Sequence, residues 1–306
     1  MAQRNTEVSP DRRTLFRIAT NLGDVVTRDN QPPGDDGNVA GRAAPTKPTT
    51  GTTTMRSPDF WSWFEGIAGP QLAYRTEGFR KLFDYLDRID RPVGIVETGC
   101  VRQQGNWAGD GQSTILFDRY AKFHPDSAVF SVDHDPEAAV LCRSLVGERV
   151  HIHAGDSLAY LKSLADHPPG GLKALDLLYL DSFDVDFDNP LPSAIHHLKE
   201  LLAIAPLVSF ETLVVVDDSP ASFIGVPNGD NAIQPIRPPR IEGKGRLIAE
   251  YADQIGAEPL FAAYQCGWLR LGRPSSVHLS ACTPSQSSQQ CRDQASTNSS
   301  APITIK

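Results

Sequence analysis

From about residue 75 to residue 272, short apolar runs alternate with segments in which apolar residues recur every three or four positions. Short runs are typical of buried strands, and the recurrence is typical of amphipathic helices. The first five runs begin at Val93, Ala128, Val150, Leu175 and Leu213. Helices are expected over 75–90, 113–123, 136–146, 158–164, 193–202 and 245–255. This alternation predicts an α/β domain whose parallel sheet is covered by helices on both faces.

The pattern changes near the end of this region. Two further apolar runs, 260–264 and 267–271, are separated only by Gln265 and Cys266. So short a connection joins antiparallel strands. We therefore expect a mostly parallel, seven-stranded sheet that ends in an antiparallel hairpin.

The two ends of the chain lack this periodicity. Residues 1–56 are rich in Pro, Gly, Thr, Asp and Arg, and residues 273–306 are rich in Ser, Gln and Thr. Neither stretch has enough apolar residues to offset the entropy lost on ordering. We expect two disordered tails around one folded domain, residues 57–272. Within it, 219–239 is expected to be irregular because it is rich in Pro, Gly and Asn.

An aromatic cluster, 58–65, lies just before the first predicted helix. The structural interpretation is an N-terminal helix that seals the sheet or the mouth of a substrate site. The alternatives are a substrate lid and a site for a partner.

Composition narrows the classes of function. The formal net charge is -8 and the domain has no basic stretch suited to phosphate backbones, so we expect no nucleic-acid partner. The five cysteines are scattered without a CxxC pair, which favours reduced thiols. No apolar run approaches the length of about 18 residues that a membrane span needs, and no apolar leader is present. We expect a soluble, cytoplasmic protein.

The first apolar run ends in Glu97-Thr-Gly-Cys, and a glycine-rich loop follows it. In an open α/β sheet, ligands bind beyond the carboxyl ends of the strands, which this loop borders. Glycine lets a backbone turn tightly and approach a ligand closely. The candidate contacts in the loop are Gly99, Gly105, Gly109 and Gly111. The spacing is not GxGxxG, which disfavours a dinucleotide.

Polar residues also follow the second and third apolar runs. Asp133 ends the second run, where a carboxylate can accept hydrogen bonds from ribose hydroxyls. Asp135 is the alternative, although its place before Pro136 also suits a helix cap. Asp156 and Ser157 follow the third run, and either can also cap the next helix.

These residues resemble the class I S-adenosylmethionine-dependent methyltransferases. The first loop resembles their E/D-x-G-x-x-x-G motif, with an insertion that moves the later glycine to about Gly111. The resemblance implies a Rossmann-like, doubly wound α/β fold with S-adenosylmethionine (SAM) as cofactor. It assigns the ribose to Asp133 and places Asp156 and Ser157 near the adenine. The implied cofactor-binding residues are Glu97, Gly99, Gly111, Ser113, Asp133, Asp156 and Ser157.

Carboxylates follow the fourth and fifth apolar runs. Asp181 ends the fourth run, and Asp217 and Asp218 end the fifth. If these strands are neighbours, their ends lie about 4.8 Å apart. Like charges at that distance repel, so raised pKa values or a bound cation must relieve the repulsion. Oxygen ligands of this kind suit Mg²⁺.

This acidic set resembles the metal site of the divalent-metal O-methyltransferases, both the catechol type and the macrolide-sugar type. The resemblance makes Asp181, Asp217 and Asp218 the ligands of a magnesium ion. A bound cation lowers the pKa of an acceptor hydroxyl and aligns it with the methyl group.

The general base stays open, because Ser182-Phe183-Asp184 stands where the catechol enzymes carry a lysine. The candidates are Asp184, His196 and His197. Asp184 can equally belong to a solvated acidic loop, 184–188. The two histidines can lie on a solvated helix face, with one ring packed inward.

The sequence thus predicts a metal-assisted O-methyltransferase for a small hydroxylated acceptor, a sugar or a secondary metabolite. A second hypothesis is a metal-independent methyltransferase in which the acidic pair only orients the substrate. A third is a nucleotide- or sugar-processing protein, or a non-catalytic Rossmann-fold binding protein. A homo-oligomer is compatible with the sequence.

Overall fold

The computed structural model describes residues 57–222, 225–227, 233–235 and 240–272. The predicted tails, 1–56 and 273–306, lie outside these residues. None of the helices in the described ranges has the length and hydropathy of a membrane span.

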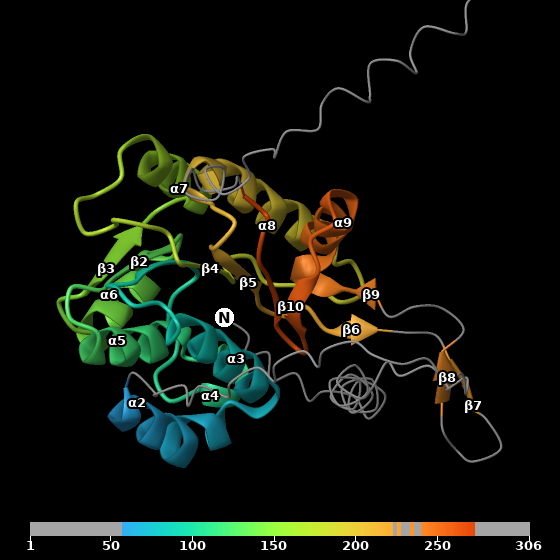
Figure 1. The fold of residues 1–306 in the computed structure, drawn as a ribbon, viewed down its shortest axis with the longest axis horizontal. Helices are drawn as coiled ribbons and strands as arrows, with labels where there is room; N and C mark the ends of the chain where they lie inside the picture. Colours follow the sequence, from blue (N-terminus) through green and yellow to red (C-terminus); the bar gives the residue numbers. More distant parts are fainter. Residues whose placement is uncertain (1–56, 223–224, 228–232, 236–239, 273–306) are drawn as a thin grey trace, which may run out of the picture. The chain divides into compact units, whose positions relative to one another are not determined.

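Seven strands form one sheet (Figure 1): β1 (Gly94–Thr98), β2 (Ala128–Asp133), β3 (Val150–Ala154), β4 (Leu177–Leu180), β5 (Leu213–Val216), β10 (Pro259–Ala262) and β11 (Cys266–Trp268). Their order is β10-β11-β5-β4-β1-β2-β3. The strands β1 to β5 pair in parallel, and β11 is antiparallel to both β5 and β10. The predicted mostly parallel sheet with a C-terminal antiparallel hairpin is confirmed.

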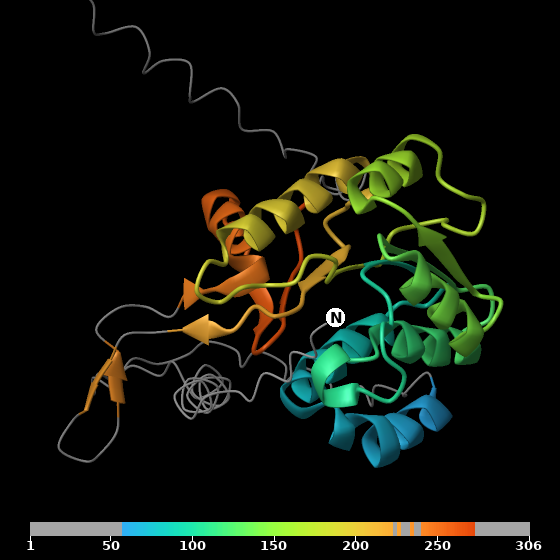
Figure 2. The ribbon, with the colours of Figure 1, turned by 180° about the vertical axis from the view of Figure 1, so that it is seen from behind.

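Helices cover both faces of the sheet (Figures 1 and 2). One layer contains α3 (Thr76–Leu86) and α5 (Ser113–Phe123). The other contains α7 (Ser157–Asp166), α8 (Leu191–Ile204) and α9 (Arg246–Ile255). A further helix, α6 (Pro136–Leu145), follows β2 and packs against β2 and β3.

The two layers are held by alternate residues of the same strands, because successive side chains of a strand point to opposite faces. Leu177 and Tyr179 of β4 belong to the apolar cluster that includes α3 and α5. Leu178 and Leu180 belong to the cluster that includes α7, α8 and α9. A fully buried side chain of this size contributes about 1.5–3 kcal/mol, so both faces of β4 stabilise the sheet.

The helices match the predicted segments, with shifted ends. The helix α8 begins at Leu191 rather than 193, because Pro192 in its first turn lacks an N–H that the helix does not need there. The helix α3 ends at Leu86 rather than 90. The shorter helical elements are η2 (Gly69–Gln71), η3 (Ala73–Arg75), α4 (Trp107–Asp110), η4 (Ala205–Leu207) and η5 (Gly243–Gly245).

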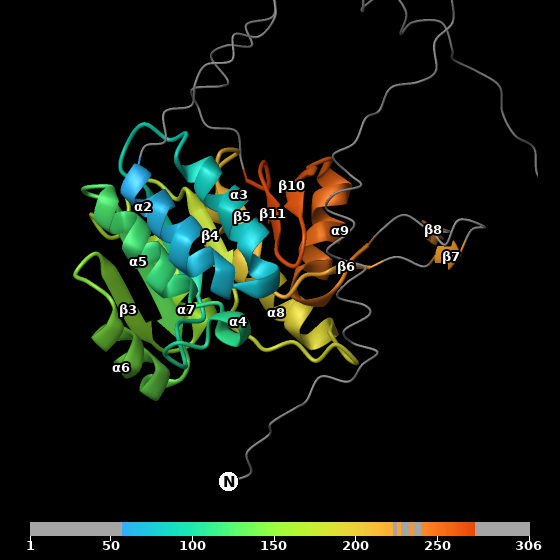
Figure 3. The same cartoon turned by 90° about the horizontal axis from the view of Figure 1, so that it is seen from below.

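The aromatic cluster 58–65 forms α2 (Pro58–Trp63) and the start of the π-helix η1 (Phe64–Ala68). Phe60 is fully buried, and its ring centroid lies 4.7 Å from that of Phe83 and 5.2 Å from that of Tyr120. The helix α2 therefore packs on α3 and α5, as Figure 3 shows from below. This packing supports the structural interpretation over a lid.

The stretch 219–239, which we expected to be irregular, contains strands in its described parts. The short strand β6 (Ala221–Ser222) pairs with β9 (Arg240–Ile241), and β7 (Gly225–Pro227) pairs with β8 (Ile233–Pro235). The expectation was wrong for these residues, since short antiparallel pairing tolerates the prolines and glycines that break longer elements.

Candidate functional site

The turn after β1 requires a glycine. Gly99 has a φ of +83°, and a Cβ atom there would lie 2.6 Å from the carbonyl oxygen of Asp181. Its backbone N–H donates a hydrogen bond to the carbonyl of Val132, at 2.8 Å. Gly99 thus lets the loop after β1 lie directly against the end of β4.

Glu97, the last acidic residue of β1, is fully buried beneath this loop. Its carboxylate accepts hydrogen bonds from Ser113 (2.5 Å), Thr114 (2.8 Å) and Ser131 (2.7 Å). Burial raises the pKa of Glu97 to about 7, against the three hydroxyl donors, which lower it. Glu97 therefore ties the start of α5 to β1 and β2, and the Ser113 hydroxyl is engaged in that contact.

Glu97 should make stability fall with rising pH. Its pKa is about 7 in the folded state against an ordinary value of 4.5, so the folded state binds more protons between these values. The free energy of unfolding should therefore drop by up to about 3 kcal/mol from pH 4.5 to pH 7. Glu97→Gln should flatten this dependence in urea denaturation, whereas Glu148→Gln, an exposed control, should leave it unchanged. Equal slopes for wild type and Glu97→Gln would contradict the assignment.

Gly111 lies against the side chain of Arg75. It ends α4 with a φ of +71°, and a Cβ atom there would lie 3.0 Å from Cδ of Arg75. The structure therefore places Gly111 against an arginine side chain, and its predicted contact with a cofactor stays a prediction.

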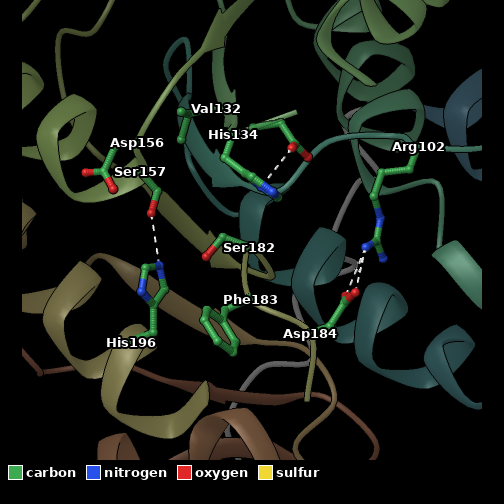
Figure 4. Close-up of a pocket in the computed structure, with 10 residues that line it drawn as sticks. Arg102, Val132, His134, Asp156, Ser157, Ser182, Phe183, Asp184 and His196 are labelled. Carbon is green, nitrogen blue, oxygen red and sulfur yellow. Dashed lines mark hydrogen bonds and ion pairs between the residues drawn. The ribbon is translucent and has the colours of Figure 1, made fainter. Parts of the chain in front are cut away.

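A cavity of about 430 Å³ opens at the carboxyl ends of β1 to β4 (Figure 4). Its lining residues are Arg102, Val132, Asp133, His134, Asp156, Ser157, Ser182, Phe183, Asp184 and His196. A smaller hollow of about 20 Å³ shares Asp133 and Ser182 with the cavity and is also lined by Gly99, Ser113 and Asp181. Of the predicted strand-end residues, Gly99, Asp133, Asp156 and Asp181 therefore face these two adjoining hollows.

Asp133 fastens two turns at this rim. Its carboxylate accepts hydrogen bonds from the backbone N–H of Cys100 (3.0 Å) and of Asp135 (2.9 Å). Asp135 itself caps α6 by accepting from the N–H of Glu137, at 2.8 Å. Asp135 is thus occupied as a helix cap, and of these two carboxylates Asp133 is the one that lines the cavity.

Asp156 and Ser157 line the cavity and also serve α7. Asp156 caps the helix by accepting from the N–H of Ala159, at 2.8 Å. The Oγ atom of Ser157 lies 3.1 Å from Nε2 of His196. The helix cap is thus observed for Asp156, and the place of both residues near an adenine stays a prediction.

Arg102 was not singled out in the sequence, yet its guanidinium lines the cavity. It forms ion pairs with Asp184 at 2.9 Å and with Asp110 at 3.3 Å. Asp184, a candidate base, is 73% exposed in its side chain and is held in this pair at the mouth of the cavity.

The two neighbouring histidines have different surroundings. His197 is fully buried, and its Nδ1 contacts the carbonyl of Ser193 at 2.7 Å. Burial lowers the pKa of His197 to about 4. His197 is not among the residues that line the cavity, and its role as a base stays a prediction. His196 does line the cavity, on the side of Asp156 and Ser157 (Figure 4).

The three predicted metal ligands meet at the ends of β4 and β5. One ligand atom from each of Asp181, Asp217 and Asp218 lies within 4.8 Å of the others. Asp218 has a φ of +42°, a left-handed conformation that aspartate tolerates better than most residues. Strain of this kind gathers at functional sites.

Two cations, Arg75 and Lys244, occupy this acidic cluster. Arg75 contacts Asp217 at 2.7 Å and Asp218 at 2.9 Å. The Nζ atom of Lys244 contacts Asp181 and lies 3.0 Å from Asp218. Among the described residues, the cluster thus holds three carboxylates and two cations. Side chains relieve most of the repulsion expected from the sequence.

Burial and the opposite charges act against each other on the pKa values of this cluster. Burial lowers the pKa of Lys244, but Asp181 and Asp218 outweigh it and raise that pKa above the ordinary value. Burial raises the pKa of Asp218, but Lys244 and Arg75 lower it overall. Burial raises the pKa of Asp181 despite Lys244. Between Asp181 and Asp218, Asp181 is therefore the carboxylate whose ionised form the cluster stabilises less.

A Gly-Lys-Gly sequence brings Lys244 to the cluster. A Cβ atom on Gly243 would lie 2.0 Å from the carbonyl oxygen of Asp218, and one on Gly245 would lie 2.6 Å from Oγ of Ser219. The backbone N–H of Lys244 donates to that carbonyl of Asp218, at 3.1 Å. A lysine between two glycines after the fifth strand is the signal that could have predicted this contact.

Comparison with known proteins finds no match among protein-family models and none among curated proteins. Among solved structures, a Thermobifida fusca YX protein designated a methyltransferase by inference is 13% identical, with a TM-score of 0.29. That match covers 55% of this chain and 61% of the other, less than two thirds of its length. A DhpI–SAH complex is 11% identical, covering 72% and 97% of the two chains, with a TM-score of 0.34. A DhpI–SAM–HEP complex is 13% identical, covering 72% and 86%, with a TM-score of 0.26. We base no inference about the site on these likenesses.

Proposed function

We propose that this chain is a SAM-dependent methyltransferase that binds its cofactor in the 430 Å³ cavity. The observation that carries the proposal is the convergence of Asp133, Asp156 and Ser157 on that cavity, beside the Gly99 turn. Asp133 offers acceptors for ribose hydroxyls, and Asp156 offers one for an adenine amino group. The volume suits a ligand of nucleoside size.

The amino-acid part of the cofactor carries a carboxylate, and Arg102 is the guanidinium in the cavity lining. Its present partner, Asp184, lies largely in solvent, where an ion pair contributes little. A ligand carboxylate can therefore replace Asp184 at Arg102 at small cost. This exchange would also free Asp184 toward an acceptor.

The acceptor would bind beside the acidic cluster. Its donor set fits Mg²⁺, because carboxylate oxygens suit this ion and because Oδ1 of Asp217 is buried without a hydrogen-bond partner among the described residues. Asp181, Asp217 and Asp218 would hold the ion. Bound there, it would lower the pKa of the acceptor hydroxyl.

A metal-independent methyltransferase is the second candidate, favoured by Arg75 and Lys244. These cations already contact all three carboxylates. In this case the cluster itself would orient the acceptor, and methyl transfer would proceed in the presence of EDTA.

Titration of the purified chain with SAM and with S-adenosylhomocysteine by calorimetry tests the proposal. We expect dissociation constants on the order of micromolar, about -8 kcal/mol, and no comparable binding of NAD, for which the loop lacks the glycine pattern. A folded protein that gives no heat with either ligand would overturn the proposal. Binding of plain nucleosides or nucleotide sugars in place of SAM would favour the binding-protein alternative.

A further inference from the structure

Glu200 of α8 is a fully buried carboxylate behind the cavity wall. It accepts hydrogen bonds from Ser182 at 2.6 Å and from Thr98 at 3.1 Å. Nε2 of His196 lies 3.3 Å from Oε1, the oxygen that also accepts from Ser182. Burial raises the pKa of Glu200, but His196, His197 and the hydroxyls lower it overall, so the group stays ionised at neutral pH.

Three partners of Glu200 connect it to different strand ends. Thr98 is the last residue of β1, and Ser182 follows β4. His196 reaches the end of β3, because its Nε2 also lies 3.1 Å from Oγ of Ser157. One buried charge thus joins three of the connections that frame the cavity.

Two of these partners form the cavity wall itself. Ser182 and His196 line the cavity, whereas Glu200 and Thr98 are not part of its lining. The His196 ring lies beside Phe183, with centroids 5.3 Å apart (Figure 4). Because a carboxylate only accepts hydrogen bonds, contact with Glu200 places a proton on Nε2 and orients the ring. The wall formed by Phe183, His196 and Ser157 carries two rings, tilted by 37° to each other, and one hydroxyl, so it is partly apolar, as a purine requires.

We propose that Glu200 is a positioning residue for cofactor binding, which holds His196 and Ser182 in the orientation that receives the purine ring. This rests on the proposed function. A buried charge is a costly way to stabilise a fold, and an apolar side chain of the same size is often as stabilising. Ligand binding explains the charge, since two of its partners, Ser182 and His196, line the cavity.

The test is the affinity of Glu200→Gln for S-adenosylhomocysteine, measured by calorimetry. The neutral amide keeps the size of the side chain but loses one acceptor oxygen and the charge toward His196. We expect the dissociation constant to rise at least about tenfold, and the KM for SAM to rise with it. With saturating SAM, kcat should stay within about twofold of wild type.

Asp176→Asn is the matched control. Asp176 is also a buried carboxylate, and it binds Arg91 and the N–H of Gly94 at the amino ends of β1 and β4, opposite to the cavity. This variant should lower the melting temperature without changing the dissociation constant. Equal losses of affinity in both variants would show a general effect of destabilisation and overturn the proposal.

Two further measurements keep the test decisive. Thr98→Val removes one hydrogen bond to Glu200 at a residue outside the cavity lining, and should weaken binding in the same direction as Glu200→Gln. It replaces Glu200→Gln in the test if that variant does not fold. His196→Ala combined with Glu200→Gln should weaken binding by less than the product of the single effects. Independent effects would contradict the proposal. If wild type itself binds no S-adenosylhomocysteine, the proposed function fails; if wild type and the Glu200 and Thr98 variants bind equally, only this inference fails.

Discussion

Lys244→Met should lower the free energy of unfolding by about 3–5 kcal/mol in metal-free buffer, the usual cost of removing one partner from a buried ion pair. The Lys244 side chain is 1% exposed, and its ammonium contacts Asp181 and Asp218. Without it, these carboxylates repel with only Arg75 to offset them. Urea denaturation with and without EDTA measures the loss.

Magnesium should restore much of that stability, because a divalent cation can take the place of the missing ammonium. Lys199→Met, on the exposed side of α8, should change stability by less than about 0.5 kcal/mol and show no response to Mg²⁺. A Lys244→Met variant as stable as wild type would contradict the ion-pair assignment. A destabilised variant that ignores Mg²⁺, together with wild-type activity in EDTA, would decide for the metal-independent candidate.

Asp133→Ala should weaken binding of SAM and of S-adenosylhomocysteine by about 100-fold, roughly 3 kcal/mol. The change removes the acceptor proposed for the ribose hydroxyls, and hydrogen bonds to a charged group contribute about 1.5–3 kcal/mol. It also releases the N–H of Cys100, which anchors the turn after Gly99. Calorimetry on the folded variant measures the loss.

Asp135→Ala is the control for this prediction. Asp135 caps α6 two residues away, so its removal should cost about 1 kcal/mol of stability while the dissociation constant stays within about twofold. If Asp135→Ala loses affinity as strongly as Asp133→Ala, the ribose assignment moves to Asp135.

Much of the fold and one side of the site could be predicted because the signals are local. The spacing of apolar residues predicts the strands and helices, and the carboxyl ends of parallel strands lie on the same side of the sheet. Asp133, Asp156 and Asp181 each stand directly after an apolar run, so their place at that edge follows from the sequence. The structure brings all three to the same rim.

The cations of the acidic cluster could not be predicted in the same way. Arg75 lies 142 positions from Asp217, and Lys244 lies 63 positions from Asp181. Neither contact follows from the spacing of neighbouring residues, and both depend on how η3 and η5 pack against the sheet. The sequence therefore showed the negative charges of the cluster without the positive ones.

The adjacent histidines show another limit. Successive residues of a helix point about 100° apart, so His196 and His197 cannot share one environment. The structure places His197 in the interior and His196 at the cavity. Which of the two histidines faces inward depends on how α8 is rotated about its axis on the sheet. Apolar residues occur on more than one side of this helix, so its sequence does not determine that rotation.

The pairing of β6 with β9 has a consequence for how this protein can be re-engineered. Ala221 is opposite Ile241 and Ser222 is opposite Arg240, so the chain leaves and returns through one pair of short antiparallel strands. Lys244 comes shortly after β9, and its backbone N–H donates a hydrogen bond to the carbonyl of Asp218, on the sheet side of this strand pair. Segments of other lengths grafted between Ser222 and Arg240 should therefore leave the contact of the Lys244 ammonium with Asp218 in place.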